Sequence, residues 1–127
     1  MKKFSVSLLI GLGLFVTEAQ AIGPYDGIWE ATYNGSPVGY YATHEKDGLV
    51  IAVSLARGNS SWEAFSGPRS GNTLSLSTLV SGVNFQGTVT FTSDSTFTAR
   101  QVSCVPVVVG VSCSLPNGAI LQGVKIW

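Results

Sequence analysis

The sequence carries little charge of either sign, which excludes one broad class of partner at the outset. Seven Lys and Arg residues and seven Asp and Glu residues are spread over 127 positions, so the formal net charge is zero. After the first 21 residues, only five scattered cations remain. Nucleic-acid binding depends on clustered positive charge against the phosphates. The composition therefore argues against a nucleic-acid partner.

Residues for the common catalytic and metal chemistries are also scarce. The chain has one histidine and two cysteines, too few for a structural zinc site. It contains no Gly-x-Ser-x-Gly turn to present a serine nucleophile. Alternation places Glu30 and Glu63 on the outward side of their strands, which disfavours paired catalytic carboxylates inside the fold. We expect no enzymatic activity, no cofactor and no metal.

The first 21 residues have the pattern of a cleavable secretory signal. Two lysines are followed by an apolar run from Phe4 to Val16 and by the small-x-small end at residues 19–21. The run is 13 residues long, whereas a membrane-spanning helix needs about 20, so a retained anchor is disfavoured. We expect cleavage after Ala21, a single domain over residues 22–127, and export to the periplasm or the exterior of a bacterial cell.

Apolar and polar residues alternate along the rest of the chain, with no sustained helical spacing. In the segment 83–91, Val83, Phe85, Val89 and Phe91 share one face, as in a half-buried strand. Turn dipeptides separate such runs at Asn34-Gly35, Asp47-Gly48, Gly58-Asn59, Ser81-Gly82 and Asn117-Gly118. The pattern predicts an all-β, antiparallel meander of about eight or nine short strands. Since long sheets with one apolar face tend to close, we expect an up-and-down barrel, with a β-sandwich as the alternative.

Two-residue turns at the first three dipeptides predict one common inner face. They pair Trp29 with Tyr40, Ala31 with Val38, and Leu55 with Trp62. The predicted inner face comprises Trp29, Ala31, Val38, Tyr40, Ala42, Ile51, Val53, Leu55, Trp62 and Ala64. Further along, Leu74, Leu76, Phe97 and Ala99 are expected inside, and the turn at 117–118 sets Leu115 against Ile120. Tyr41 and Phe65 are expected outside.

Three residues of this predicted face, Trp29, Tyr40 and Trp62, are candidates for a ligand pocket. The same register points His44 inward, and it is the fourth candidate. His44 lies at the end of its strand beside Glu45 and Asp47. A lone histidine beside a turn is more often a rim residue than a metal ligand or a general base. A filled core is the alternative to a pocket, because small barrels are often packed by their own side chains.

The two cysteines, Cys104 and Cys113, flank a valine-rich stretch, CVPVVVGVSC. In an exported protein, two cysteines nine residues apart most simply form a disulfide, which requires a chain reversal near Val108. The competing interpretation is a straight strand from Val107 to Leu115, and the two exclude each other. The expected compartment favours the bridge. Val107, Val108 and Val109 would then form an apolar tip, either a plug or a partner surface.

An outer-membrane barrel would need a continuous apolar outer surface. The residues predicted to face outward are polar at several positions: Thr43, Glu45, Glu63, Gln86, Thr88 and Arg100. We therefore do not expect an integral membrane protein.

The segment GIWEATY at residues 27–33 resembles the Gly-x-Trp opening of the calycin barrels, the lipocalin and avidin group. In that group the tryptophan lies on the first strand at one end of the barrel, and the resemblance implies this place for Trp29. The rest of the chain resembles small secreted bacterial β proteins. Neither resemblance implies a ligand.

Two functions are consistent with these observations. The first is an exported, soluble, non-enzymatic binding module for a small apolar ligand or a protein partner. The alternative is a structural or interaction protein of the cell envelope or extracellular matrix, with a filled core and an exposed strand surface. A cavity inside the barrel would favour the first function, and a sealed interior the second.

Overall fold

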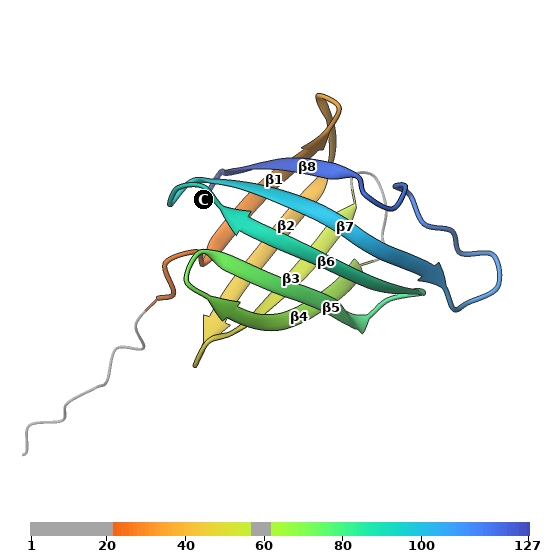
Figure 1. The fold of residues 1–127 in the computed structure, drawn as a ribbon, viewed down its shortest axis with the longest axis horizontal. Helices are drawn as coiled ribbons and strands as arrows, with labels where there is room; N and C mark the ends of the chain where they lie inside the picture. Colours follow the sequence, from red (N-terminus) through yellow and green to blue (C-terminus); the bar gives the residue numbers. More distant parts are fainter. Residues whose placement is uncertain (1–21, 57–61) are drawn as a thin grey trace, which may run out of the picture.

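A computed structural model describes residues 22–56 and 62–127, which form eight strands in a closed barrel (Figure 1). Each strand pairs antiparallel with its sequence neighbour, and the last strand pairs with the first. The strands are β1 (Gly27–Tyr33), β2 (Ser36–Lys46), β3 (Leu49–Ala56), β4 (Trp62–Ser70), β5 (Thr73–Val80), β6 (Val83–Phe91), β7 (Thr96–Pro106) and β8 (Ile120–Lys125). The predicted up-and-down barrel is confirmed, and the sandwich alternative is wrong. The expected leader, residues 1–21, and the turn at Gly58-Asn59 lie outside the described residues.

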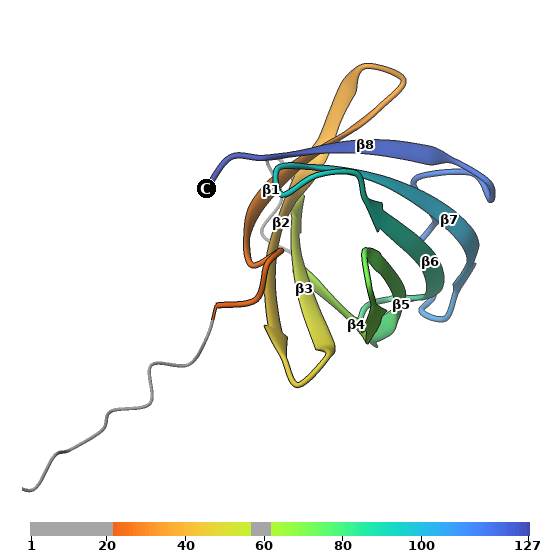
Figure 2. The same cartoon turned by 60° about the vertical axis from the view of Figure 1, so that its left-hand side comes forward.

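Because the strands alternate in direction, the connections fall at two ends of the barrel (Figure 2). Residues 22–26, the turns after β2, β4 and β6, and the C-terminal residues lie at one end, which we call the closed end. The turns after β1 and β5 lie at the other, which we call the open end, together with residues 107–119 between β7 and β8. We call residues 107–119 the disulfide loop.

Two of the predicted hairpin turns have the expected backbone. Asn34 and Gly35 have φ values of 49° and 78°, and Asp47 and Gly48 have 53° and 76°. Positive φ at both central residues is typical of the type I′ turn that fits the twist of a hairpin. The predicted pairing of β2 with β3 is confirmed, and so is the pairing of Leu55 with Trp62.

The register between β1 and β2 differs from the prediction because of a β-bulge. Thr32 pairs with Pro37, but Ala31 pairs with Gly39, so Val38 has no residue opposite it. Trp29 consequently pairs with Tyr41, not with Tyr40. Proline has no amide hydrogen to donate to a ladder, and in sheets it is tolerated at edges and bulges. Pro37 is therefore the residue that accounts for the irregularity.

The bulge inverts the predicted faces of β2, β3 and β4, because a shift of one residue moves every side chain to the other side of a sheet. Trp29, Ala31 and Val38 do face inward as predicted. The prediction was wrong for Tyr40, Ala42, His44, Ile51, Val53, Leu55, Trp62 and Ala64, which lie on the outer side. It was also wrong for Tyr41, Thr43, Glu45, Glu63 and Phe65, which lie on the inner side.

One row on the outer side of β1 to β5 is consequently apolar. Ile28, Ala42, Val53, Ala64 and Val80 pair in turn across five adjacent strands. The neighbouring row contains Leu55 and Trp62, which are 53% and 54% exposed. By contrast, Asn84, Gln86 and Thr90 on the outer side of β6 are polar and exposed. The predicted inward positions on β5, β6 and β7, from Leu74 to Ala99, are confirmed.

Aromatic residues fill the interior at the closed end. Trp29 is completely buried, and its ring centroid lies 5.4 Å from those of Phe91 and Phe97. Its indole Nε1 donates to the Tyr25 carbonyl and to Thr43 Oγ1. Tyr25 stacks on Phe91 at 3.7 Å and covers this end. At Gly123 an added Cβ would come within 2.0 Å of Phe97, so the glycine makes room for that ring.

An ion pair lies beside this aromatic cluster. The Arg69 guanidinium donates from Nε and Nη2 to the two Glu45 carboxylate oxygens, both at 2.7 Å. This two-point contact, the strongest arrangement of an arginine and a carboxylate, raises the pKa of Arg69. The guanidinium also lies over the Tyr25 ring at 5.6 Å. The Glu45–Arg69 ion pair, the stacked Tyr25 and Phe91 rings and residues 22–26 thus cover the closed end of the barrel together.

The open end lacks the last hairpin that the sequence predicted. Residues 107–119 are not a strand, and Arg100, not Leu115, pairs with Ile120. Asn117-Gly118 is a turn, with Gly118 at φ 85°, but it leads into β8 from the disulfide loop. The prediction was wrong because the disulfide joins Cys104 to Cys113, only nine residues further on, and so turns the chain back on itself. Residues 113–115 therefore do not extend into a strand opposite β8.

Candidate functional site

A cavity of about 380 Å³ occupies the barrel between the aromatic cluster and the open end. Its volume lies within the range of about 300 to 1,000 Å³ that is common for small-molecule sites. Most of the lining is apolar, with Phe65, Leu76, Phe85, Val89 and Leu121 on the walls. The interior is therefore not completely filled by its own side chains, unlike a packed small barrel.

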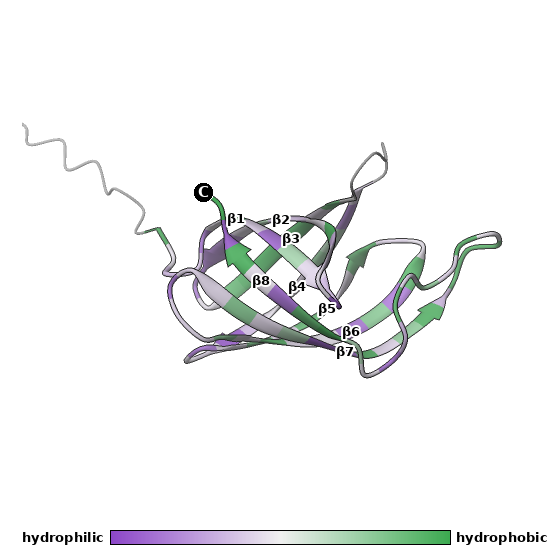
Figure 3. Cartoon of the chain, turned by 90° about the horizontal axis from the view of Figure 1, so that it is seen from above, coloured by the Kyte–Doolittle hydropathy of each residue, from purple (hydrophilic) through white to green (hydrophobic). Residues whose placement is uncertain are grey.

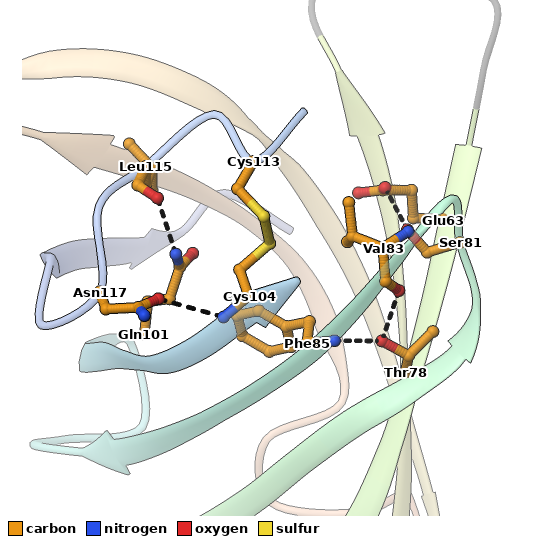
Figure 4. Close-up of a disulfide and its surroundings, with 10 residues drawn as sticks. All are labelled: Glu63, Thr78, Ser81, Val83, Phe85, Gln101, Cys104, Cys113, Leu115 and Asn117. Atoms are coloured by element: carbon orange, nitrogen blue, oxygen red, sulfur yellow. Dashed lines mark hydrogen bonds between the residues drawn. A yellow bond between two sulfur atoms is a disulfide. The ribbon is translucent and has the colours of Figure 1, made fainter. Parts of the chain in front are cut away.

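One row of the wall is polar toward the open end. Trp29, Tyr41, Ser54 and Glu63 are successive cross-strand partners on β1, β2, β3 and β4, and all four line the cavity. Glu63 Oε1 accepts a hydrogen bond of 2.5 Å from the Ser81 hydroxyl (Figure 4). The same Ser81 oxygen accepts from the Val83 amide. Ser81 thus fixes Glu63 against the turn between β5 and β6.

The surroundings of the Tyr41 phenol change its pKa. Burial raises its pKa, a hydrogen bond with Ser54 lowers it, and the negative charge of Glu63 raises it further, with burial the largest influence. The net direction is upward. At neutral pH the cavity therefore presents a neutral phenol near a carboxylate.

The disulfide loop covers part of the open end (Figure 4). The predicted bridge between Cys104 and Cys113 is confirmed, with the two Cα atoms 6.1 Å apart. Gln101, which is buried, donates from Nε2 to the Leu115 carbonyl at 2.7 Å. The Cys104 amide donates to Asn117 Oδ1 at 3.0 Å. These bonds hold residues 112–115 against the cavity, and all four of those residues line it.

The valine tip lies beyond this covering, at the far end of the loop. Val107, Val108 and Val109 are exposed, and Val109 is exposed over its whole side chain. Figure 3 shows the loop projecting from the barrel with hydrophobic residues at its tip. Both the Val107 and the Val108 amides donate to the Gly82 carbonyl. The tip is therefore an exposed surface and does not plug the cavity.

The structure brings only one of the four predicted ligand residues to the cavity. Trp29 forms its floor. Tyr40 and Trp62 are on the outer side because of the bulge at Val38. His44 is exposed near the closed end, where its Nδ1 lies 2.9 Å from Asp26 Oδ2. These three residues do not line the cavity.

Several polar residues of the cavity were not among the predicted site residues, and Tyr41, Glu63 and Gln101 are the most prominent. The first two were assigned to the wrong side by the same one-residue shift. Gln101 follows the correctly placed Phe97 and Ala99 at the alternating position, so its inward direction could have been read from the sequence. A second bulge leaves Val102 without a residue opposite it, so that both Gln101 and Cys104 face inward.

Within residues 22–56 and 62–127, no three His, Cys, Asp or Glu side chains come together in a way that could hold a metal ion. The same part of the chain has no helix long and apolar enough to cross a membrane. Comparison with known proteins finds no matching family model, no similar curated protein and no similar solved structure.

Proposed function

We propose that the protein is an exported, non-enzymatic binding module that holds a small, mainly apolar ligand inside the barrel. The observation that carries this proposal is the cavity of about 380 Å³ with its mainly apolar wall. An apolar cavity with a few polar groups is the usual form of a small-molecule site. The resemblance of Gly27-Ile28-Trp29 to the calycin opening is consistent with such a role.

Export is supported by the disulfide and by the signal-like first 21 residues. Disulfides persist in oxidising compartments such as the periplasm and the exterior of the cell. The bridge here ties down the loop that covers the cavity. We therefore place the protein in the periplasm or outside a bacterial cell, where the bridge keeps the binding site in shape.

Filling the cavity tests the binding role. Ala52 is buried and lines the cavity, and Ala42 on the paired strand lies outside and is exposed. N-phenyl-1-naphthylamine, a neutral apolar fluorophore, should bind the parent and become brighter. Ala52→Phe should abolish that binding, while the matched control Ala42→Phe should retain it. Equal binding by both variants would place the fluorophore outside the barrel and contradict the proposal.

Native mass spectrometry of protein purified from its exporting host is a second test. A small molecule that co-purifies with the parent and is missing from Ala52→Phe would support the cavity as its site. The adduct should dissociate when the protein is unfolded, because no covalent chemistry is proposed.

The second candidate function is an interaction protein that uses the apolar rows on the outer side of β1 to β5. Its specific support is the row around Leu55 and Trp62, which are large, exposed and adjacent. Extended exposed apolar patches often mark interaction surfaces. The cavity argues against the filled-core form of this alternative. Sedimentation of the parent against Leu55→Ser/Trp62→Ser would detect association through this surface as a mass that falls in the variant.

A further inference from the structure

The cavity contains one acidic side chain among its described lining residues, and that residue is Glu63. Arg100 is the positively charged residue among the described lining residues. Its side chain is exposed, because it lies on the outward side of β7 between the inward residues Ala99 and Gln101. Within the described residues, the salt bridges join other groups, at Asp26 and Glu45. Among the described residues no cation pairs with Glu63, which is half-buried. A positively charged group bound beside it would therefore stabilise its carboxylate.

Glu63 retains capacity to accept more hydrogen bonds. An ionised carboxylate offers about four lone-pair sites on its two oxygens. The Ser81 hydroxyl occupies one of them, on Oε1. Ser54, directly opposite on β3, and Tyr41, the next residue in the same row, both carry hydroxyl groups and line the cavity. This row of oxygens suits a group that donates several hydrogen bonds at once.

We infer that the ligand of this cavity is an amphipathic amine whose ammonium group is held by Glu63 and whose apolar part extends toward Trp29. This inference rests on the proposed function and specifies its ligand class. An ammonium group has three donors and a positive charge, so it compensates the carboxylate and uses the neighbouring hydroxyls as acceptors. A ligand with an anionic end would be repelled by Glu63 and would lose its hydration without a partner.

The apolar part of such a ligand has a defined place. Phe85 and Leu76 line the cavity together with Phe65, whose ring centroid lies 4.9 Å from that of Phe85. Trp29, Phe91 and Phe97 close the cavity at its far end. An amine with a chain or ring of moderate length therefore places its charge near the open end, where Glu63 is half-buried, and its apolar atoms against the aromatic floor.

The test compares three probes with the same chain and different ends: octylammonium, 1-octanol and octanoate, by isothermal titration calorimetry at pH 7. At this pH an alkylamine is protonated, like the lysine side chain. The parent should bind octylammonium at least about tenfold more tightly than 1-octanol, because a charge-assisted hydrogen bond is the stronger one. It should bind octanoate more weakly than either.

Glu63→Gln removes the charge with little change in shape, and it should reduce the preference for octylammonium over 1-octanol to about twofold or less. Glu30→Gln is the matched control, since Glu30 lies on the outer side of β1 next to the inward Trp29. It should keep the parent's preference. Circular dichroism of both variants checks that the barrel is folded.

The outcomes separate the inference from the proposed function. If all three probes bind the parent equally well, the cavity binds apolar molecules and the amine inference is wrong. Tighter binding of octanoate would overturn it as well, and so would an unchanged preference in a folded Glu63→Gln variant. If the parent binds none of the probes and does not bind N-phenyl-1-naphthylamine, the proposed function itself fails. The comparison of probes on the parent alone decides the inference even if Glu63→Gln does not fold.

Discussion

The two ends of the barrel are closed by different means. At the closed end, Tyr25, Trp29 and Phe91 pack ring against ring, and the Glu45 and Arg69 side chains pair beside them. At the open end, a loop without regular secondary structure lies over the cavity, tied by a disulfide and by side-chain bonds to its backbone. One end is filled and the other is only covered.

Under the proposed function, this difference separates the residues that stabilise the fold from those that would contact a ligand. Aromatic packing removes most apolar surface from water at the closed end, and such burial is the main source of folding free energy. The open end can then leave space unfilled, because its loop is held by the disulfide and by side-chain hydrogen bonds as well as by packing. We therefore expect substitutions at the closed end to affect the free energy of unfolding most, and substitutions at the open end to affect ligand binding.

The largest effect is expected at Trp29. Trp29→Ala should lower the free energy of unfolding by about 3 to 5 kcal/mol, the range for removing a large buried side chain, because Trp29 is 0% exposed. Trp62→Ala should lower it by less than about 1 kcal/mol, since Trp62 lies on the outer side. Urea titrations followed by circular dichroism measure both. Equal losses would contradict the assignment of Trp62 to the outer surface.

The contrast between these two tryptophans also shows where sequence reasoning succeeds and where it fails. The pairing of Leu55 with Trp62 was predicted correctly, because turn chemistry determines which residues lie opposite each other. The side of the sheet that each residue faces was predicted wrongly. The unpaired residue Val38 shifts the register by one, which moves the side chains of the following strands to the opposite side. Pro37 was the available signal of a bulge.

Alternation could not correct that error, since β2 and β3 carry apolar or aromatic residues on both sides. Tyr40 and Tyr41 are the same residue type, and Ala52 and Val53 are both apolar, so their residue types do not show which of each pair faces inward. On β6 the outer positions, such as Asn84 and Gln86, are polar. The alternation of polar and apolar residues was therefore sufficient to identify the inner face of this strand. The candidate site was missed for the same reason, because Tyr41 and Glu63 lie on the strands whose sides are ambiguous.

The next largest effect is expected from the disulfide at the open end. Cys104→Ser/Cys113→Ser should lower the free energy of unfolding by roughly 2.5 to 3 kcal/mol, the value for a small closed loop in the chain-entropy model. The change should be local. Amide hydrogen exchange should accelerate at Val107 and Gly118, whose amides bond to the barrel, and stay slow at Trp29. Accelerated exchange at Trp29 would mean that the two ends are not independent.

A smaller effect is expected at alkaline pH from Tyr41. The pKa of Tyr41 is raised in the folded protein, chiefly by burial. The proton is therefore bound more tightly in the folded state, and the associated stability is complete below the unfolded pKa of about 10. It is lost as the pH rises through the higher folded value. Urea titrations between pH 8 and 11 should show this loss in the parent.

Tyr41→Phe should show less of this alkaline loss, because phenylalanine cannot ionise. Tyr40→Phe is the control on the outer side, and it should lose stability with pH as the parent does. A Tyr41→Phe variant with the full alkaline loss would place the responsible group elsewhere. Such a result would contradict the conclusion that burial in the cavity raises the pKa of Tyr41.

The smallest effect on stability is expected at the valine tip. Val108→Ser/Val109→Ser should change the free energy of unfolding by less than about 0.5 kcal/mol and the melting temperature by less than about 4 °C, because both side chains are exposed.

Val111→Ser is the informative control. The Val111 side chain packs so closely on Gly82 that an added Cβ there would lie 3.0 Å from it, so this substitution should lower the melting temperature more. A double variant that melts far below the parent would show that the tip belongs to the folded core. A melting temperature close to that of the parent would leave the three valines as an apolar surface that the disulfide holds outward at the open end of the barrel.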